Sequence, residues 1–347
     1  MKFAIMLGAT LFGILLGFVP GITRSRPVWW RWIAILSVTA TVVLGLYPPI
    51  AGTVTDAVMA ARMDSTKVVP VLVVRQIDPS NDSSLTVVDA RDPRVVIHVD
   101  ASEDVAAAID ATDAPFILDL QRSGSDMRFM AQKMGPVDPL ITLPYIMGLE
   151  ERARIIFFHV PMSWVATIAY LLSMIFAVRY LRSRDLNHDT ISMATASVGT
   201  LYAVLATVTG AVWAKFNWGS IWNWDPRETS IFLLLLVYAA YFLLRSSIEE
   251  PQRRARLSAA YSIVAFVTVP FLIFVLPRLL PGLHPGSSDD VNAGPLLSPK
   301  SDAINTTKQV VFGLSLFAFT VVFFWLVNLK VRLVGLTDRI NDNEVRS

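Results

Sequence analysis

The sequence predicts an all-α polytopic membrane protein of about seven transmembrane helices with a small α+β extracytoplasmic insertion. Among its 347 residues, 54% are hydrophobic and 17% are charged, and the mean hydropathy is +0.52. Several apolar runs approach the 20 or so residues that a helix needs to cross roughly 30 Å of hydrocarbon. Residues 51–151 are instead mixed in polarity. Together these observations place the chain among integral membrane proteins.

Charge and cysteine content exclude several functional classes. The net charge is only +2, which gives no general attraction to nucleic acid. The chain contains no cysteine, so disulfides, thiolate metal sites and cysteine nucleophiles are excluded. A bound metal would therefore depend largely on histidine. The sequence contains four histidines, which are His98, His159, His188 and His284.

Seven apolar segments are candidates for membrane helices. They are Phe3–Val19, Trp32–Tyr47, Ile155–Tyr180, Ile191–Ala214, Thr229–Arg245, Leu257–Leu276 and Val310–Leu329. The first resembles a signal peptide, but the arginine-rich segment after it, Pro20–Arg31, lacks a clean small-residue cleavage site, so we expect a retained helix.

Arginine-rich ends of these segments predict the orientation of the chain. Clusters of arginine follow the first, third and fifth segments, and basic residues also follow the seventh. Cytoplasmic loops are enriched in Lys and Arg. All four clusters fall on one side if the N-terminus is extracytoplasmic and the C-terminus cytoplasmic. Residues 1–50 then form two helices, 51–151 an outer insertion, 152–332 a core of five helices, and 333–347 a cytoplasmic tail.

The insertion shows the pattern of a small α+β domain. Four short β-branched runs predict strands, and a helix is expected between the third and the fourth, with Ser102 as its N-cap. The predicted strands are Val68–Ile77, Leu85–Ala90, Val95–Val99 and Pro115–Leu120, and the predicted helix is Ser102–Asp110. His98 lies on a strand, where a surface role is more common than metal ligation.

Tryptophans are concentrated between the fourth and fifth membrane segments. Residues 218–229 read Trp-Gly-Ser-Ile-Trp-Asn-Trp-Asp-Pro-Arg-Glu-Thr. Scattered tryptophans are typical of any membrane interface. Here Gly219 permits close backbone approach and Pro226 restrains the chain directly after Asp225. A flat ligand needs large aromatic faces, so we interpret Trp218, Trp222 and Trp224 as the wall of a binding site.

Two histidines are predicted at the same membrane face as this loop. His159 lies near the outer end of the third segment, and His284 follows the outer end of the sixth. Two neutral imidazoles that approach one centre from opposite sides can supply the axial ligands of a haem iron. A zinc site would need three or four ligands. Ionisable residues near a bilayer are costly and tend to be functional, so we favour haem.

The tryptophan motif and the residues around His159 resemble a known family. The pattern Trp218-Gly219-x-x-Trp222-x-Trp224-Asp225, together with Arg154-Ile-Ile-Phe-Phe-His159-Val-Pro161 and Trp164, is similar to cytochrome c maturation protein C, also called haem exporter protein C. The resemblance covers roughly residues 151–331. It implies that His159 and His284 ligate non-covalent haem b. We expect Arg227 near a propionate, because guanidinium pairs bidentately with carboxylate.

The resemblance also implies partners and a location. The expected partners are a membrane-anchored haem chaperone (cytochrome c maturation protein E), ATP-binding cassette subunits (maturation proteins A and B), a small single-helix subunit and the lipid bilayer. Nucleic acid is not expected. The implied site lies on the outer face of the cytoplasmic membrane. The chain has no P-loop and no nucleophile–base arrangement, so we expect a haem transfer protein and not an enzyme.

Two alternatives remain open. Asp225-Pro-Arg-Glu-Thr229 is also similar to the cytochrome c synthases of the other biogenesis system, so the chain can be a haem-handling subunit of a synthase. Such proteins usually carry further histidines in membrane helices. The second alternative is a haem-free transporter subunit, which would need a polar pathway across the bilayer.

Overall fold

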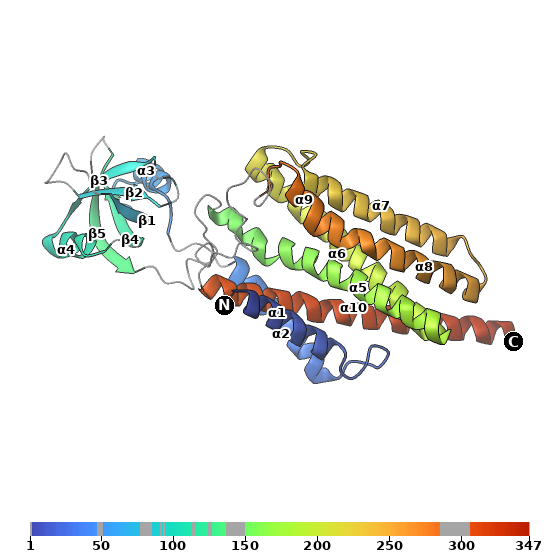
Figure 1. The fold of residues 1–347 in the computed structure, drawn as a ribbon. Coiled ribbons are helices and arrows are strands. Elements are labelled where there is room, and N and C mark those ends of the chain that lie inside the picture. Colours follow the sequence, from blue (N-terminus) through green and yellow to red (C-terminus); the bar gives the residue numbers. More distant parts are fainter. Residues whose placement is uncertain are drawn as a thin grey trace. The chain divides into compact units, whose positions relative to one another are not determined.

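The computed structural model describes most of the chain and divides it into two compact units. The described residues are 2–46, 51–76, 85–90, 92, 94–112, 115–123, 127–136, 150–284 and 306–346. One unit contains Met1–Gly45 and Arg154–Ser347, and the other contains Leu46–Ala153. The first is helical and the second is built around a β-barrel, and each is described by itself (Figure 1).

Long helices form the first unit. They are α1 (Lys2–Gly17), α2 (Val28–Leu46), the 3₁₀ segment η1 (Glu150–Phe157), α5 (His159–Ser183), α6 (Leu186–Trp218), α7 (Pro226–Ser246), α8 (Pro251–Pro270), the π-helical turn η2 (Phe271–Val275), α9 (Leu276–Leu279) and α10 (Thr306–Arg346). The chain therefore stays helical through residues 333–346, which the sequence predicts as a tail.

Six of these segments are long and apolar enough to cross a membrane. Among the described residues they are Val28–Leu46, Arg154–Ser183, Leu186–Trp218, Pro226–Ser246, Pro251–Leu279 and Lys308–Thr337. The predicted count of seven is not confirmed, because α1 has only 16 residues. At 1.5 Å per residue, a helix of that length is about 24 Å long, somewhat less than the hydrocarbon thickness.

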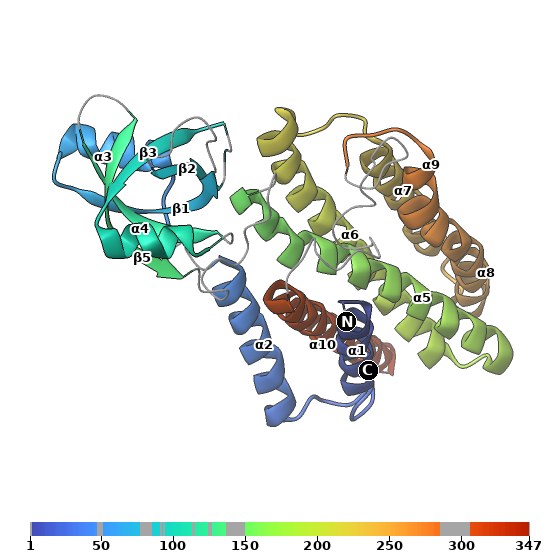
Figure 2. The same cartoon turned by 60° about the vertical axis from the view of Figure 1, so that its left-hand side comes forward.

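The helices are arranged in three groups (Figure 2). The antiparallel pair α5 and α6 lies in the middle, α7, α8 and α9 lie on one side, and α1, α2 and α10 lie on the other. Small residues allow close approach in the middle pair. A Cβ on Gly199 of α6 would lie 2.6 Å from the Cβ of Ala169, so glycine is required there. Such small-residue contacts are typical of helix packing in membranes.

A buried arginine in the connection between α1 and α2 contacts α10. Arg26, which is 2% exposed, donates to the carbonyl oxygens of Val19, Gly17 and Phe324. Its guanidinium also lies 4.6 Å from the ring centroid of Trp30. The carbonyls at the end of α1 carry partial negative charge, so they stabilise a cation that has left water.

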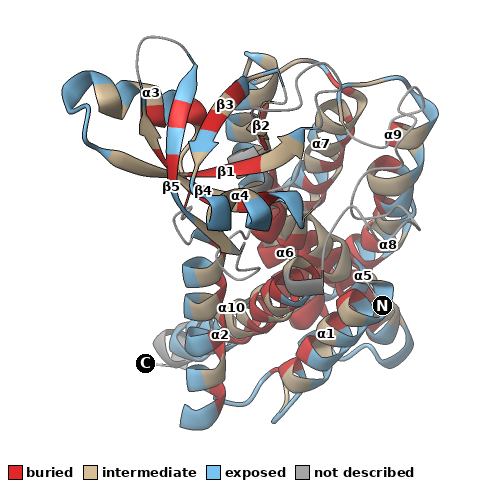
Figure 3. Ribbon diagram, turned by 90° about the vertical axis from the view of Figure 1, so that its left-hand side faces the viewer, coloured by how far each residue is buried: buried red, intermediate tan, exposed pale blue. Residues whose placement is uncertain are grey.

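Aromatic residues of α5 and α7 belong to the buried core of the helical unit, and buried residues are coloured red in Figure 3. Tyr170 and Tyr238 are fully buried and stack with 3.6 Å between their centroids.

In the last turn of α7, Arg245 forms a bidentate ion pair with the buried Asp189 of α6. The pair is well hydrogen-bonded, which is what a buried ion pair needs to offset the loss of hydration.

The second unit is a closed five-stranded barrel with two helices. Its elements are α3 (Val54–Met63), β1 (Val68–Gln76), β2 (Leu85–Asp89), β3 (Val96–Ala101), α4 (Glu103–Asp110), β4 (Phe116–Arg122) and β5 (Arg128–Pro136). The strand order is β1-β2-β3-β5-β4, closed by β1 against β4. Strands β3 and β5 are parallel and the other pairs are antiparallel. A closed five-stranded barrel of this order is of the OB type.

Helix α3 and strand β5 were not predicted from the sequence. Strand β5 contains Lys133 and Gly135 and lacks a clear alternating pattern, but its Phe129 and Ala131 are buried in the barrel core. Helix α3 begins with a capping box between Thr53 and Asp56. Ser102 is the N-cap of α4 as predicted, although its side chain forms no capping hydrogen bond.

Candidate functional site

The tryptophan-rich loop joins α6 to α7 and is shaped by residues at its two ends. Gly219 ends α6 with φ 82°, a left-handed conformation that suits glycine. Asp225 is the N-cap of α7 and Pro226 occupies its first turn. Glu228 completes a capping box, since one carboxylate oxygen accepts the backbone N–H groups of Asn223 and Asp225. The local sequence therefore determines both ends of the loop.

Asp225 connects this loop to the segment after α9. One of its carboxylate oxygens accepts the backbone N–H of Arg227 and lies 2.8 Å from Nδ1 of His284. The other accepts the backbone N–H of Leu283 at 2.7 Å. The side chain of Asp225 is only 1% exposed. Burial by itself would raise its pKa, but the hydrogen bond and charge of His284 and the two backbone donors outweigh burial and lower the pKa to about 2.

The ionised Asp225 determines which nitrogen of His284 carries hydrogen. A carboxylate only accepts hydrogen bonds, so Nδ1 of His284 is the donor. In the neutral tautomer the lone pair then lies on Nε2. Carboxylates that orient a ligating histidine in this way are common around protein-bound metals.

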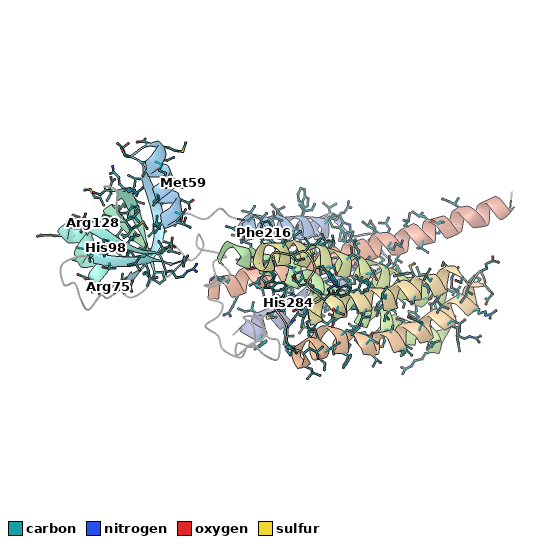
Figure 4. The ribbon with its side chains drawn as sticks, turned by 90° about the horizontal axis from the view of Figure 1, so that it is seen from above. Met59, Arg75, His98, Arg128, Phe216 and His284 are labelled. Atoms are coloured by element: carbon teal, nitrogen blue, oxygen red, sulfur yellow. The ribbon has the colours of Figure 1, made fainter. Side chains whose placement is uncertain are left out.

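Two tryptophan rings pack around His284. Its ring centroid lies 4.8 Å from that of Trp218 and 6.2 Å from that of Trp213, and the two indoles meet edge to face at 5.1 Å. The imidazole is thus held between aromatic faces and the Asp225 carboxylate. Figure 4 shows His284 at one end of the helical unit, together with Phe216 near the end of α6.

His159 is the first residue of α5 and approaches the same region. Its Nδ1 lies 2.8 Å from the carbonyl oxygen of Ala206, which only accepts, so Nδ1 is again the donor. The ring packs on Gly210 of α6, where an added Cβ would lie 2.8 Å from Cε1. His284 lies beside Trp213, three residues further along α6 than the Gly210 that His159 packs on. The structure therefore places both predicted histidines against the same stretch of α6.

Trp222, Trp224 and Trp164 make other contacts. Trp222 meets Trp224 edge to face at 5.8 Å and also contacts Phe232. Trp224 is 71% exposed and has φ 55°, an uncommon conformation for a residue with a side chain. Trp164 donates to Thr10 of α1 and packs edge-on to Phe274. The predicted tryptophans therefore do not form one wall. Trp218 contacts His284, whereas Trp222 and Trp224 contact each other.

Three neighbours of the site were not identified from the sequence. Trp213 lies beside His284 with the two rings tilted, Gly210 leaves room for His159, and Arg278 of α9 lies on the segment that leads to His284. Trp213 precedes Trp218 by five residues and extends the tryptophan motif, so the sequence could have indicated it as a site residue. Gly210 and Arg278 have no local signature, because only packing between helices gives them their neighbours.

The donor set fits an axially ligated haem better than a small metal ion. No group of three or more His, Asp or Glu side chains suited to a metal ion occurs among the described residues. Both site histidines instead use Nδ1 for a protein acceptor, which leaves the Nε2 lone pair for a ligand in the neutral form. A haem iron needs only two such axial donors.

The fold and the site together define a polytopic helical membrane protein with two histidines and an arginine beside a tryptophan-rich loop. The family model of heme exporter protein C matches residues 125–346, which is well over half of the chain. The chain therefore belongs to the heme exporter protein C family. The resemblance inferred from the tryptophan and histidine motifs is confirmed.

Individual relatives match shorter segments. Heme exporter protein C of Bradyrhizobium diazoefficiens is 31% identical over 121 residues, or 35% of this chain and 46% of that protein. The Paracoccus denitrificans protein of the same name is 33% identical over 135 residues, or 39% and 56%. The cytochrome c biogenesis protein CcsA of Prochlorococcus marinus is 44% identical over 85 residues, or 24% and 27%. The chain thus spans about half the length of the first two relatives.

Proposed function

We propose that this protein holds haem b non-covalently between His159 and His284 and passes it on for the biogenesis of c-type cytochromes. The observation that carries the proposal is the convergence of the two histidines. Each comes from a different part of the bundle, each donates Nδ1 to a protein acceptor, and both lie against the Gly210–Trp213 stretch of α6. Relatives named heme exporter protein C support the same ligand.

Each side chain then has a defined task. His159 and His284 would coordinate iron through Nε2, while Trp218 covers the ligand beside His284. Arg227 would pair with a propionate, because guanidinium binds carboxylate in a bidentate manner. When bound, haem supplies an iron that accepts two axial imidazoles. Gly219 shapes the loop. The exposed Trp224, which contacts Trp222, would offer an aromatic surface for the transfer of haem to the partner.

The proposal includes a location and partners. We place the site on the outer face of the cytoplasmic membrane. The core of residues 152–332 would handle haem. Trp164, which donates a hydrogen bond to Thr10 of α1, would help to hold α5 in position. The receiving partner is a membrane-anchored haem chaperone, and ATP-binding cassette subunits with a small single-helix subunit supply driven steps. The chain itself would transfer haem without catalysing a reaction.

A second candidate is a haem-handling subunit of a cytochrome c synthase. The observation in its favour is the 44% identity over 85 residues to a CcsA protein. It predicts attachment of haem to an apocytochrome by this chain and its direct partner, without a separate chaperone. Co-expression with an apocytochrome, with and without the chaperone, distinguishes the two functions.

Absorption spectroscopy of the purified protein tests haem ligation. We expect a low-spin, bis-histidine spectrum from protein made in haem-replete cells. His159→Ala or His284→Ala should give high-spin or absent haem, whereas Trp222→Ala and Trp224→Ala should keep the low-spin spectrum. His98→Ala in the barrel and His188→Ala, whose ring bonds Ser183 at the start of the α5–α6 connection, are controls. Wild-type protein without a Soret band, even after reconstitution, would refute the proposal.

A further inference from the structure

The connection between α1 and α2 carries a buried arginine without a carboxylate partner. Arg26 is 2% exposed, and its guanidinium donates to the backbone carbonyl oxygens of Gly17, Val19 and Phe324. Its Nε is buried and forms no hydrogen bond with the part of the chain that the structure describes. Carbonyl dipoles offset some of the cost of burying a charge, but they do not cancel the charge itself. Arg26 therefore places a net positive charge just below the surface.

Three further arginines belong to the same region. Nε of Arg31 donates to the backbone carbonyl oxygen of Arg26 at 3.2 Å. Arg24 is held against α10, because the side chain of Asn328 donates to its carbonyl oxygen at 2.8 Å. Arg332 follows Asn328 by four residues, so it lies on the face of α10 that contacts the connection. Arg24, Arg31 and Arg332 are exposed, and together with Arg26 they form what we call the arginine cluster.

Acidic side chains do not balance the arginine cluster. Residues 1–55 and 303–337, which contain both of its segments, have no Asp or Glu. Within the described ranges, none of the four arginines forms an ion pair. The other end of this comparison is Arg245, whose buried guanidinium does have a carboxylate, that of Asp189. Orientation in a membrane explains exposed basic residues, but it does not require a buried arginine beneath them.

Exposed apolar residues of α2 adjoin the arginine cluster. Trp29 and Trp32, on either side of Arg31 in the sequence, are 50% and 56% exposed, and Leu36 in the next turn is 61% exposed. These three residues follow one another at helical spacing, so they share a face of α2. Tryptophan rings lie at the level of the lipid headgroups. The surface therefore fits an amphiphile with an anionic head and hydrocarbon chains better than it fits a free anion.

We propose that the arginine cluster binds the phosphate of an anionic phospholipid, whose acyl chains lie along the exposed face of α2. Arg24 and Arg31 contact the phosphate through charge-assisted hydrogen bonds, and the buried Arg26 adds a charge that salt screens only weakly. The arginine-rich helix ends predict this side to be cytoplasmic, where anionic lipids make the membrane surface negative. The lipid site involves neither His159 nor His284, so it does not depend on the proposed function.

Thermal unfolding of the full-length protein in mixed micelles tests this site. The micelles contain dioleoylphosphatidylglycerol or dioleoylphosphatidylcholine, which have the same acyl chains and differ in net charge. We expect phosphatidylglycerol to raise the unfolding midpoint of wild-type protein by about 5 °C relative to phosphatidylcholine, because a ligand of the folded state stabilises it. The double variant Arg24→Gln/Arg31→Gln should unfold at the same midpoint with either lipid. Both side chains are exposed, so we expect the variant to fold.

A matched control removes the same charge elsewhere. Arg182→Gln/Arg256→Gln changes two exposed arginines of α5 and α8 and should keep the full effect of phosphatidylglycerol. If Arg24→Gln/Arg31→Gln keeps that effect, or if the control loses it as well, the site is wrongly assigned.

Inorganic phosphate at matched ionic strength distinguishes a lipid from a free anion. We expect it to shift the midpoints of wild-type protein and of Arg24→Gln/Arg31→Gln equally. A phosphate shift as large as that of phosphatidylglycerol, and absent from Arg24→Gln/Arg31→Gln, would assign the arginine cluster to a free anion and overturn the lipid proposal.

Discussion

Asp225 is the residue on which the geometry of the site depends most. Its place directly before Pro226 predicts hydrogen bonds to nearby backbone or indole groups. The structure gives it the backbone N–H of Arg227 and also two partners 58 and 59 residues away, Leu283 and His284. A carboxylate with several donors stays ionised at low pH. Asp225 therefore fixes the His284 tautomer and the position of the loop together.

This arrangement predicts a pH dependence of the haem-free protein. The pKa of Asp225 falls from 3.8 to about 2 on folding. A lowered folded-state pKa contributes stability that is present above pH 4 and lost as the pH falls towards 2, by about 2 kcal/mol. Tryptophan fluorescence should report loosening around Trp213 and Trp218 in that window. Asp225→Asn should remove this step, and an unchanged acid transition in the variant would contradict the assignment.

At the scale of elements, the contact of α5 with α6 positions His159. Gly210 leaves space for the imidazole, since an added Cβ would lie 2.8 Å from Cε1. Alanine is normally the better helix residue by about 1 kcal/mol. Any loss in a Gly210→Ala variant must therefore come from displacement of the His159 ring.

We expect Gly210→Ala to convert bound haem from low-spin to high-spin, or to reduce its occupancy several-fold, with little loss of helical structure. Absorption and circular dichroism spectra measure the two effects. Gly335→Ala in α10 is the matched control, because nothing lies within 4 Å of the Cβ it adds. A low-spin spectrum of wild-type intensity in Gly210→Ala would show that the ring is not held as described.

At the scale of the whole molecule, the two units have separate hydrophobic cores. The barrel core contains residues such as Val71, Phe116 and Phe129, and the helical core contains residues such as Tyr170 and Phe323. The arginines at the helix ends predict an orientation in which the barrel and the tryptophan-rich loop are outside.

Cysteine labelling tests this orientation, and the absence of native cysteine makes it free of background. Ser65 of the barrel unit and Ser247 between α7 and α8 are both exposed. An impermeant thiol reagent should label Ser65→Cys in spheroplasts and label Ser247→Cys only after permeabilisation. The reverse pattern would invert the orientation and place the haem site on the cytoplasmic side.

Local chemistry was sufficient to predict much of this protein. Hydropathy predicted the six long membrane segments, because the bilayer imposes a minimum apolar length. The Asp225-Pro226 pair predicted the start of α7, and the motif from Trp218 to Asp225 predicted the family. Those properties depend on neighbouring residues, so sequence alone determined them.

Other features depend on residues that are distant in sequence, and only the tertiary structure decided them. Strand β5 forms because Phe129 and Ala131 complete a barrel core, although its own pattern is weak. Trp218, and not Trp222 or Trp224, contacts His284 because Asp225 draws the segment after α9 against the end of α6. Sequence patterns predict that both histidines and the loop share one membrane face, but they do not determine which side chains touch, because packing across the whole bundle makes that choice.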